Sequence, residues 1–243
     1  NDIMSGNAGN DTLSGGAGDD LINGGIGDDS VSGDAGDDRI ILLAGNDTAD
    51  GGDGNDIMSG NAGNDTLSGG AGDDLINGGI GDDSVSGDAG DDRIILLAGN
   101  DTADGGDGND IMSGNAGNDT LSGGAGDDLI NGGTGDDRMD GGAGNDTLIG
   151  AEGADTFVFA SGGGSDIFRG FTGGADAAAS DRLELDEALW LDSVGTLDAA
   201  AIVAQFAAVN EAGFVEFAFA EAEGFELLGV TETTGLENYI DIV

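Results

Sequence analysis

The sequence predicts an all-β protein: a right-handed parallel β-roll over residues 1–162, followed by a mixed β cap with one helix over residues 163–243. Three observations predict this fold. Residues 1–162 divide into 18 consecutive nine-residue units without an insertion, the second residue of every unit is Asp, and the ninth is Gly. The fourth residue is always apolar, from Met4 through Ile22 to Phe157. A generic Asp-rich and Gly-rich composition does not keep three positions in phase for so long, so each unit is one structural repeat.

Each unit contains one turn and one short strand. The segment Gly15-Gly16-Ala17-Gly18-Asp19-Asp20 is typical of a turn, because paired glycines reach positive φ angles without steric cost. The following Leu21-Ile22-Asn23 is predicted as a short strand with one inward side chain. Two such units close one coil, so odd units stack into one parallel sheet and even units into another. Nine coils at about 4.8 Å per strand make a prism roughly 43 Å long.

The charge of the chain indicates that a cation enters this fold. The chain carries 50 acidic and 5 basic residues, a formal net charge of -45 that opposes a compact state. Turns on one edge recur at every second unit, so we expect Asp11 to stack on Asp29 and Asp20 on Asp38, with turn carbonyls between the layers. The chain has no His and no Cys, which removes the usual ligands of zinc, copper and iron. Several carboxylate and carbonyl oxygens on loops suit calcium better than magnesium. Without calcium, this composition is typical of a disordered acidic chain.

The predicted calcium ligands are the second-position aspartates and the carbonyl groups of turn glycines. The aspartates are Asp11, Asp20, Asp29, Asp38, Asp47, Asp56, Asp65, Asp74, Asp83, Asp92, Asp101, Asp110, Asp119, Asp128, Asp137, Asp146 and Asp155, and the glycines are Gly18, Gly27, Gly36, Gly72, Gly81, Gly90, Gly126 and Gly135. The 17 turns form 15 stacked pairs, but Leu42-Leu43 and Leu96-Leu97 replace the glycine pair in two turns, which leaves 11 unaltered pairs. We therefore expect about 11 to 15 calcium ions.

A longer repeat shapes the outer surface. Residues 1–54 are identical to residues 55–108, and residues 109–133 repeat residues 1–25, so the surface pattern recurs every three coils. The outward positions of the even sheet are polar: Thr12, Ser14, Ser30, Ser32, Thr48 and Asp50 in the first block. Those of the odd sheet include Ile3, Leu21, Ile41, Ile57, Leu75, Ile95, Ile111 and Leu129. With the double-leucine turns nearby, this face is predicted to carry an apolar stripe that packs against another protomer or an upstream domain. The alternative is a scatter of aliphatic residues tolerated in strands.

After Gly162 the nine-residue period ends, and the composition predicts an ordinary mixed cap. Strands are predicted near residues 155–160, 166–171, 182–186, 214–220, 225–230 and 239–243. One helix is predicted from Ala199 to Asn210, capped by Asp198, with Ile202, Val203, Phe206 and Val209 on one face and Gly213 just past its end. Such a cap would cover the open parallel edge of the last coil.

The nonapeptide units resemble the repeats-in-toxin (RTX) family, which implies a parallel β-roll that binds calcium between successive turns on each edge. The tail resembles the C-terminal region of secreted members, including the non-catalytic half of serralysin-type proteases. The matching segments are Ala154-Asp155-Thr156-Phe157-Val158-Phe159, Ser165-Asp166-Ile167-Phe168-Arg169-Gly170-Phe171, Asp181-Arg182-Leu183-Glu184-Leu185 and Tyr239-Ile240-Asp241-Ile242-Val243. This resemblance implies that the last few dozen residues address the protein to a type I secretion channel. The implied location is secreted, extracellular or on the cell surface.

The composition disfavours other classes of function. Without His or Cys there is no Ser-His pair and no thiol nucleophile, and no pair in the regular carboxylate array stands out as an acid and a base. Five basic residues against 50 acids disfavour nucleic acid, and no apolar run approaches the roughly 20 residues of a membrane span. We therefore expect a non-catalytic, calcium-dependent folding module of a secreted protein, which folds where calcium is about 10⁻⁴ to 10⁻³ M. The alternative is a self-assembling extracellular scaffold, such as a surface layer, matrix fibre or adhesin stalk.

Overall fold

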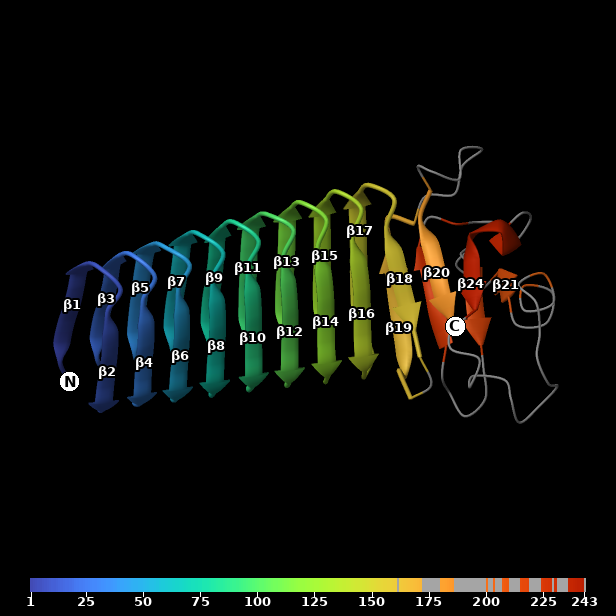
Figure 1. Cartoon of the computed structure of the whole chain (residues 1–243). Helices are drawn as coiled ribbons and strands as arrows, with labels where there is room; N and C mark the ends of the chain where they lie inside the picture. The colour runs from blue at the N-terminus through green and yellow to red at the C-terminus, as the bar shows by residue number, and fades with distance from the viewer. Residues whose placement is uncertain are drawn as a thin grey trace.

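The computed structural model describes residues 1–160, 162–171, 180–185, 200, 203, 207–209, 215–218, 224–228, 230 and 236–242. Over the nonapeptide units the chain winds into a long prism, with one parallel sheet on each broad face and turns along both edges (Figure 1). Within the described ranges, no helix combines the length and hydropathy of a transmembrane span.

Each of the nonapeptide units up to residue 152 forms a strand of six residues. These strands are β1 (Ile3–Ala8), β2 (Thr12–Ala17), β3 (Leu21–Ile26), β4 (Ser30–Ala35), β5 (Arg39–Ala44), β6 (Thr48–Asp53), β7 (Ile57–Ala62), β8 (Thr66–Ala71), β9 (Leu75–Ile80), β10 (Ser84–Ala89), β11 (Arg93–Ala98), β12 (Thr102–Asp107), β13 (Ile111–Ala116), β14 (Thr120–Ala125), β15 (Leu129–Thr134), β16 (Arg138–Ala143) and β17 (Thr147–Glu152).

The odd-numbered strands form one sheet and the even-numbered strands form the other, here called the odd sheet and the even sheet. Up to β17 every neighbouring pair is parallel and shifted by two repeat units, as Met4 with Ile22 and Leu13 with Val31 show. This arrangement confirms the predicted β-roll of two parallel sheets, in which equivalent residues of successive coils are 18 positions apart. Turns that leave odd strands lie on one edge of the prism, the odd-to-even edge. Turns that leave even strands lie on the other, the even-to-odd edge.

The strands are twice as long as the sequence predicts. The glycine pair that was expected to begin the turn stays in the sheet, since Asn7 still pairs with Gly25 and Ala8 with Ile26. From Asn7 to Ala151 the seventh residue of each unit has positive φ, 71° at Asn7 and 118° at Gly25, which changes the direction of the strand without ending its pairing. The neighbouring coil repeats the same distortion, so the two backbones stay in hydrogen-bonding register.

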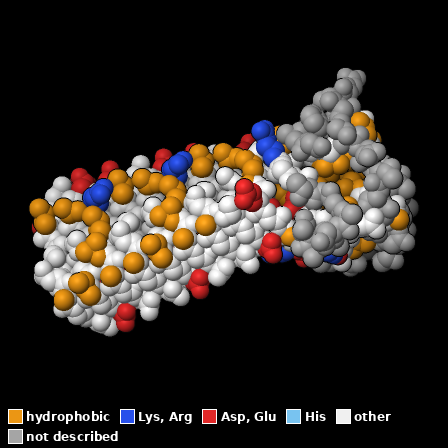
Figure 2. Space-filling view, turned by 90° about the horizontal axis from the view of Figure 1, so that it is seen from above, with side chains coloured by type: hydrophobic (Ala, Val, Ile, Leu, Met, Phe, Trp, Pro, Cys, Tyr) orange, Lys and Arg blue, Asp and Glu red, His pale blue; other side chains and the backbone are white. Residues whose placement is uncertain are grey.

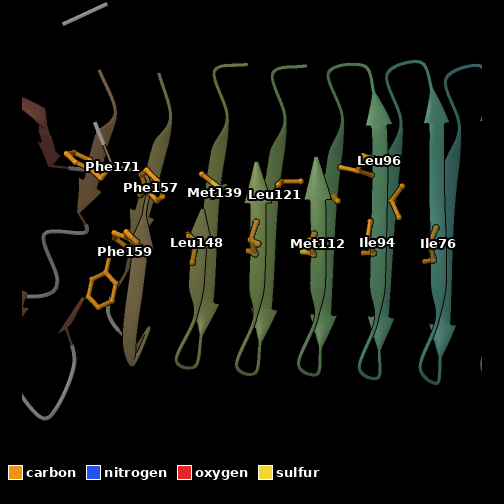
Figure 3. Packing of buried hydrophobic residues seen from close by; sticks show 14 of the residues in the cluster. Ile76, Ile94, Leu96, Met112, Leu121, Met139, Leu148, Phe157, Phe159 and Phe171 are labelled. Atoms are coloured by element: carbon orange, nitrogen blue, oxygen red, sulfur yellow. The ribbon is translucent and has the colours of Figure 1, made fainter. Parts of the chain in front are cut away.

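The core is a narrow channel between the two sheets, filled by the fourth residue of each unit. Its buried members are Ile22, Val31, Ile40, Ala49, Met58, Leu67, Ile76, Val85, Ile94, Ala103, Met112, Leu121, Ile130, Met139, Leu148 and Phe157. Figure 3 shows the labelled side chains meeting between the strands of the two sheets. Each coil thus contributes few large side chains, so hydrophobic burial stabilises the roll weakly for its length.

Leu42 and Leu96 belong to this core, although the sequence placed them with the outer apolar stripe. Both are 0 % exposed, because the sixth residue of a unit points inward like the fourth. At the equivalent position of another coil, a β-carbon on Gly150 would lie 3.1 Å from the ring of Phe157. In the Leu42 and Leu96 coils the residue matching Phe157 is only an alanine, so the leucine fills the volume that a larger fourth residue occupies elsewhere.

The outer face of the odd sheet carries rows of exposed aliphatic side chains, as the sequence predicts. Ile3, Leu21, Ile57, Leu75, Ile111 and Leu129 are exposed, Ile41 and Ile95 are half-buried, and Leu43 and Leu97 are exposed beside the buried leucines. Ile26 and Ile80 lie at the ends of their strands. Beyond the first coil they are the most exposed large aliphatic side chains of the odd sheet, at 63 % and 66 %. Figure 2 shows hydrophobic side chains in rows along the roll, with arginines at intervals.

Beyond the repeats the two sheets continue into the C-terminal region. The predicted strands there are confirmed as β18 (Thr156–Phe159), β19 (Ser165–Arg169), β20 (Arg182–Leu185), β22 (Val215–Ala218), β23 (Gly224–Leu228) and β24 (Ile240–Ile242), the last preceded by a 3₁₀ turn at Leu236–Tyr239. β23 adds parallel to β19, and β22 then runs antiparallel to β23. Phe157 and Phe168 stack with ring centroids 5.2 Å apart, and Arg182 forms an ion pair with Asp241.

The predicted helix from Ala199 to Asn210 is wrong at its C-terminal end. Ala200 and Val203 are helical, but Ala207–Val209 forms strand β21, which pairs antiparallel with β22. The exposed edge of β22 offers backbone hydrogen bonds that the amphipathic pattern of this segment did not reveal. The other residues of the prediction, Asp198, Ile202, Phe206 and Gly213, lie outside the described residues.

Candidate metal centre

The second-position aspartates lie inside the turns and are buried there. From Asp20 to Asp155 each is at most 4 % exposed, and Asp11 in the first coil is half-buried. Each follows two turn residues and precedes the first residue of a strand, so its side chain points back under its own turn. The turns of neighbouring coils then shield it from water. A row of buried carboxylates therefore runs along each edge of the prism.

One oxygen of each carboxylate ties two coils together. The backbone N–H of Asp11 donates to Oδ1 of Asp29 at 2.8 Å, and the N–H of Asp20 donates to Oδ1 of Asp38 at 2.7 Å. The same bond recurs at every step from one coil to the next until the N–H of Asp137 donates to Asp155. The predicted stacking of these aspartates is thereby confirmed.

The other oxygen of each carboxylate, Oδ2, is buried and accepts no hydrogen bond in the structure. This is true of all 17 aspartates from Asp11 to Asp155 that the sequence selected as ligands. A buried carboxylate oxygen without a donor is costly, because the ionised group has lost water and gained only one hydrogen bond. One such atom would be a defect, whereas a regular row of them indicates a missing positive partner.

A backbone carbonyl of the next coil lies beside most of these unpaired oxygens. A β-carbon built on Gly15 would collide with Oδ2 of Asp20 and would lie 2.7 Å from the carbonyl oxygen of Gly33. Both oxygens therefore border the same small space under the sixth residue of the unit. A side chain at this residue would fill the space, so the residue must be glycine. The requirement is steric and not conformational, since Gly15 and Gly33 have no positive φ.

Burial raises the pKa of most of these carboxyl groups. Desolvation is the largest cause throughout, and neighbouring aspartates raise the pKa further at several sites. The pKa reaches about 7 at Asp74, Asp128 and Asp137, and about 6 at Asp47, Asp56, Asp83, Asp92, Asp101, Asp146 and Asp155. Neutral pH thus leaves negative charge in a desolvated site, which only a cation can offset.

The donor set of these spaces fits a hard cation bound by mixed ligands. Within the described residues, no three Asp or Glu side chains gather closely enough to hold a metal by themselves. An ion here would combine one or two Asp Oδ2 atoms with backbone carbonyl oxygens such as that of Gly33. Such an all-oxygen set of carboxylates and carbonyls is typical of calcium.

Comparison with known families agrees with this geometry. The model of the RTX calcium-binding nonapeptide repeat matches residues 1–31, 32–67, 50–85, 59–94, 68–103, 86–121, 122–157 and 131–168. The chain belongs to the RTX calcium-binding nonapeptide repeat family. Its β-roll is therefore a calcium-binding repeat structure.

The RTX chain also matches individual solved structures. Among solved structures, the extracellular lipase LipA from Serratia marcescens is 21 % identical, with a TM-score of 0.34. The alignment covers 93 % of this chain but 38 % of the lipase, so the chain spans well under half of that protein. No curated protein sequence matches the chain significantly.

The first residue of each RTX repeat, which was not among the predicted site residues, forms a second ladder between coils. It is always Asn or Asp up to residue 145, and from Asn10 on its Oδ1 accepts a hydrogen bond from the backbone of the next coil. Asp37 Oδ1 accepts from the N–H of Asn55 at 3.0 Å, and Asn46 Oδ1 accepts from that of Asn64 at 2.9 Å. The unvarying choice of a short amide or carboxylate was the signal for this role.

The aspartate ladder also extends past the last RTX repeat. Asp166 accepts from the N–H of Asp146 at 3.0 Å, and Asp181 accepts from that of Asp155 at 2.9 Å. Burial raises the pKa of Asp166 to about 8. Neither was predicted as a site residue, because the nine-residue spacing is lost here. In both, as in the repeats, an apolar residue stands two positions after the aspartate.

The glycines predicted as carbonyl ligands occupy the tightest points of the turns. Gly27 and Gly36 have φ of 122° and 131°, and the N–H of Gly27 donates to the carbonyl of Ala44 at 2.8 Å. A β-carbon on Gly36 would lie 2.6 Å from the carbonyl carbon of Gly18. Backbone conformation and close stacking thus both require glycine here. Their role as calcium ligands stays a prediction.

The two leucine turns interrupt one edge of the prism. Leu42 and Leu96 both lie near the ends of odd strands, so the altered turns lie on the odd-to-even edge. On the other edge, the sixth position of every unit from Gly15 to Gly141 is glycine. The carbonyl oxygen of Leu42 lies 3.3 Å from the β-carbon position of Gly24, whereas that of Gly33 lies 2.7 Å from the β-carbon position of Gly15. The carbonyl oxygen of Leu42 thus lies farther from the neighbouring space, and the leucine side chain takes the place that glycine leaves open in other turns.

Proposed function

We propose that the RTX roll is a calcium-dependent folding module in which calcium ions occupy the spaces between stacked turns. The observation that carries the proposal is the two rows of buried Oδ2 atoms, 17 in all, that accept no hydrogen bond. The ligands would be the aspartates from Asp11 to Asp155, together with turn carbonyls. Because these sites exist only when two coils stack, the free energy of calcium binding is free energy of folding.

The number of ions follows from the turns. We propose about 11 to 15 calcium ions, the lower figure if the spaces next to Leu42 and Leu96 stay empty. Such a number supplies roughly half or more of the positive charge needed against the net charge of -45. Residues 1–162 would form the calcium-binding unit, and residues 163–243 would close its open end and carry the type I secretion address.

The biological setting in this proposal is outside the cell. A chain that needs about 10⁻⁴ to 10⁻³ M calcium stays unfolded at cytosolic calcium levels and folds after export. No catalytic role is assigned to the module, because its carboxylates form a uniform ladder in which none is set apart as acid or base. The scaffold alternative has one observation in its favour, namely the exposed aliphatic rows on the odd sheet.

The test is a calcium titration of the full chain, followed by far-UV circular dichroism and by metal analysis after dialysis, with magnesium as the control. We expect a cooperative gain of β signal near millimolar calcium, about 11 to 15 bound ions and no effect of magnesium. An unchanged spectrum up to several millimolar calcium, or an equal response to magnesium, would contradict the proposal.

A further inference from the structure

The two broad faces of the roll carry opposite charge. The odd strands from β1 to β15 contain Arg39 and Arg93 and no acidic residue, whereas the even strands from β2 to β14 contain six aspartates and no basic residue. Among the described residues, neither arginine takes part in an ion pair, unlike Arg138 and Arg182. In a chain with only 5 basic residues, two arginines thus lie exposed in a row whose other members are apolar.

The two arginines of the odd sheet lie in one row with six aliphatic residues; this odd row is formed by the first residue of each odd strand from β1 to β15. In order along the roll it reads Ile3, Leu21, Arg39, Ile57, Leu75, Arg93, Ile111, Leu129. The odd row lies at the even-to-odd edge, where odd strands begin. All eight side chains are exposed.

A matching row ends the even strands at the same edge but on the opposite face. This even row reads Ala17, Ala35, Asp53, Ala71, Ala89, Asp107, Ala125, Ala143. Coil by coil, each aliphatic residue of the odd row corresponds to an alanine of the even row, and each arginine corresponds to an aspartate. Arg39 and Asp53 share the third coil, and Arg93 and Asp107 share the sixth.

We propose that this chain associates with further copies of itself by stacking the odd sheet of one roll on the even sheet of the next. A plain translation across the sheets sets each odd row against the even row of the neighbour in the same orientation. Arg39 then meets Asp53 of the second copy and Arg93 meets Asp107, while the large aliphatic side chains meet alanines. A shift by one coil would set both arginines against alanines, so charge fixes the register.

The size of this contact suits a stable interface. Nine coils of about 4.8 Å and strands of about 20 Å give roughly 850 Å² per copy, close to the roughly 800 Å² per partner of standard interfaces. At the second edge, Ile26 and Ile80 would face Ser30 and Ser84, so no like charges meet there. The least favourable contact sets Ile41 of one copy near Asp50 of the next.

The proposed contact is heterologous, because each roll uses a different face toward each neighbour. Such an interface does not close under translation, so stacking continues into an open-ended layer of rolls. The proposed assembly rests on the proposed function in one respect, because it requires the calcium-folded roll. Calcium would therefore control assembly by creating both faces.

Charge exchange tests this proposal on the full chain in calcium by sedimentation velocity over a concentration series. The native chain should form species larger than a dimer. Arg39→Asp with Arg93→Asp, and separately Asp53→Arg with Asp107→Arg, should each weaken association at least about tenfold by opposing like charges. An equimolar mixture of the two variants should assemble again, since every contact then joins an arginine to an aspartate. A monomeric native chain, variants that assemble like it, or a mixture that stays monomeric would overturn the proposal.

A milder pair of variants controls for folding and net charge. Asp53→Asn with Asp107→Asn should weaken assembly, whereas Asp37→Asn with Asp91→Asn changes net charge equally at turn positions where other repeats carry Asn. The control pair should assemble like the native chain, and equal effects of both pairs would overturn the proposal. Circular dichroism in calcium separates the two hypotheses, because absence of the β signal in the native chain contradicts the calcium-folding proposal itself.

Discussion

At the scale of the residue, the two oxygens of one carboxylate have different tasks. Oδ1 of Asp74 accepts a hydrogen bond from the N–H of Asp56 at 2.7 Å, which sets the register of two coils. Oδ2 of the same residue is buried without a donor. The first oxygen needs only an acceptor, which an amide also supplies, whereas the second needs negative charge to bind a cation. Substitution by Asn therefore separates the structural task from the proposed metal task.

Asp74→Asn should reduce calcium binding while keeping the coil register. We expect about one fewer bound ion and a higher calcium concentration at the folding midpoint, because a neutral amide replaces a carboxylate ligand. Metal analysis after dialysis and a calcium titration by circular dichroism measure both effects.

Asp73→Asn is the matched control for this substitution. Asp73 is exposed, its Oδ1 accepts from the N–H of Asp91 at 3.0 Å, and Asn55 makes the same bond one coil earlier. Ion count and midpoint should therefore stay at native values in the control. Equal losses in both variants would show that net charge, and not the buried oxygen, governs binding.

At the scale of the element, the strand of each repeat survives a left-handed residue near its end. Where that residue is not glycine, the conformation carries strain, as at Leu43 with φ of 77° and Leu97 with φ of 74°. The neighbouring Leu42 and Leu96 are the fully buried members of each pair. Adjacent leucines of one strand therefore act on stability in opposite directions.

Substitutions in this pair should separate packing from backbone strain. Leu96→Ala should lower the free energy of unfolding in calcium by about 2 to 5 kcal/mol, because it leaves a cavity in the core channel. Leu97→Gly should leave stability unchanged or raise it by up to about 1 kcal/mol, because glycine adopts positive φ without strain. Denaturant unfolding at saturating calcium measures both, and comparable losses would contradict the assignment of Leu96 to the core.

The same turns control the predicted number of ions on the odd-to-even edge. Leu42→Gly with Leu96→Gly reopens the spaces beside both residues, so we expect up to about four additional calcium ions per chain. Leu43→Gly with Leu97→Gly is the control, since it leaves both inward leucines in place and should not change the ion count. Metal analysis of the two double variants decides the point, and an unchanged count in both would mean that leucine does not block the sites.

At the scale of the whole molecule, the roll has a small core for its length and many buried carboxyl groups. Their pKa is raised in the folded state from an ordinary value of 3.8 to about 6 or 7 at ten second-position aspartates between Asp47 and Asp155. A folded pKa above the unfolded one means that the folded roll binds protons more tightly. This contribution to stability is complete below about pH 4 and is lost as pH rises through 6 to 7.

Acid should therefore partly replace calcium. Without calcium, the chain should gain β signal as pH falls from 8 through 6, because protonation removes buried negative charge. With calcium present, the concentration needed for folding should instead rise over the same interval, because protons compete for the carboxylates. Circular dichroism against pH, with chelator and with calcium, checks both trends. A calcium requirement independent of pH would contradict a carboxylate site.

Periodicity was sufficient to derive the coil of the roll, the sharing of units between two sheets and the aspartates that stack in the turns. These features follow from an uninterrupted repeat, because one position in nine that recurs in phase must occupy equivalent places. Contacts between coils settled what a single unit cannot reveal. They extended the strands through the glycine pair, placed Leu42 and Leu96 in the core, and carried the ladder on to Asp166 and Asp181. They also drew Ala207–Val209 from a predicted helix into a strand, since an open sheet edge supplies hydrogen bonds that local periodicity does not encode.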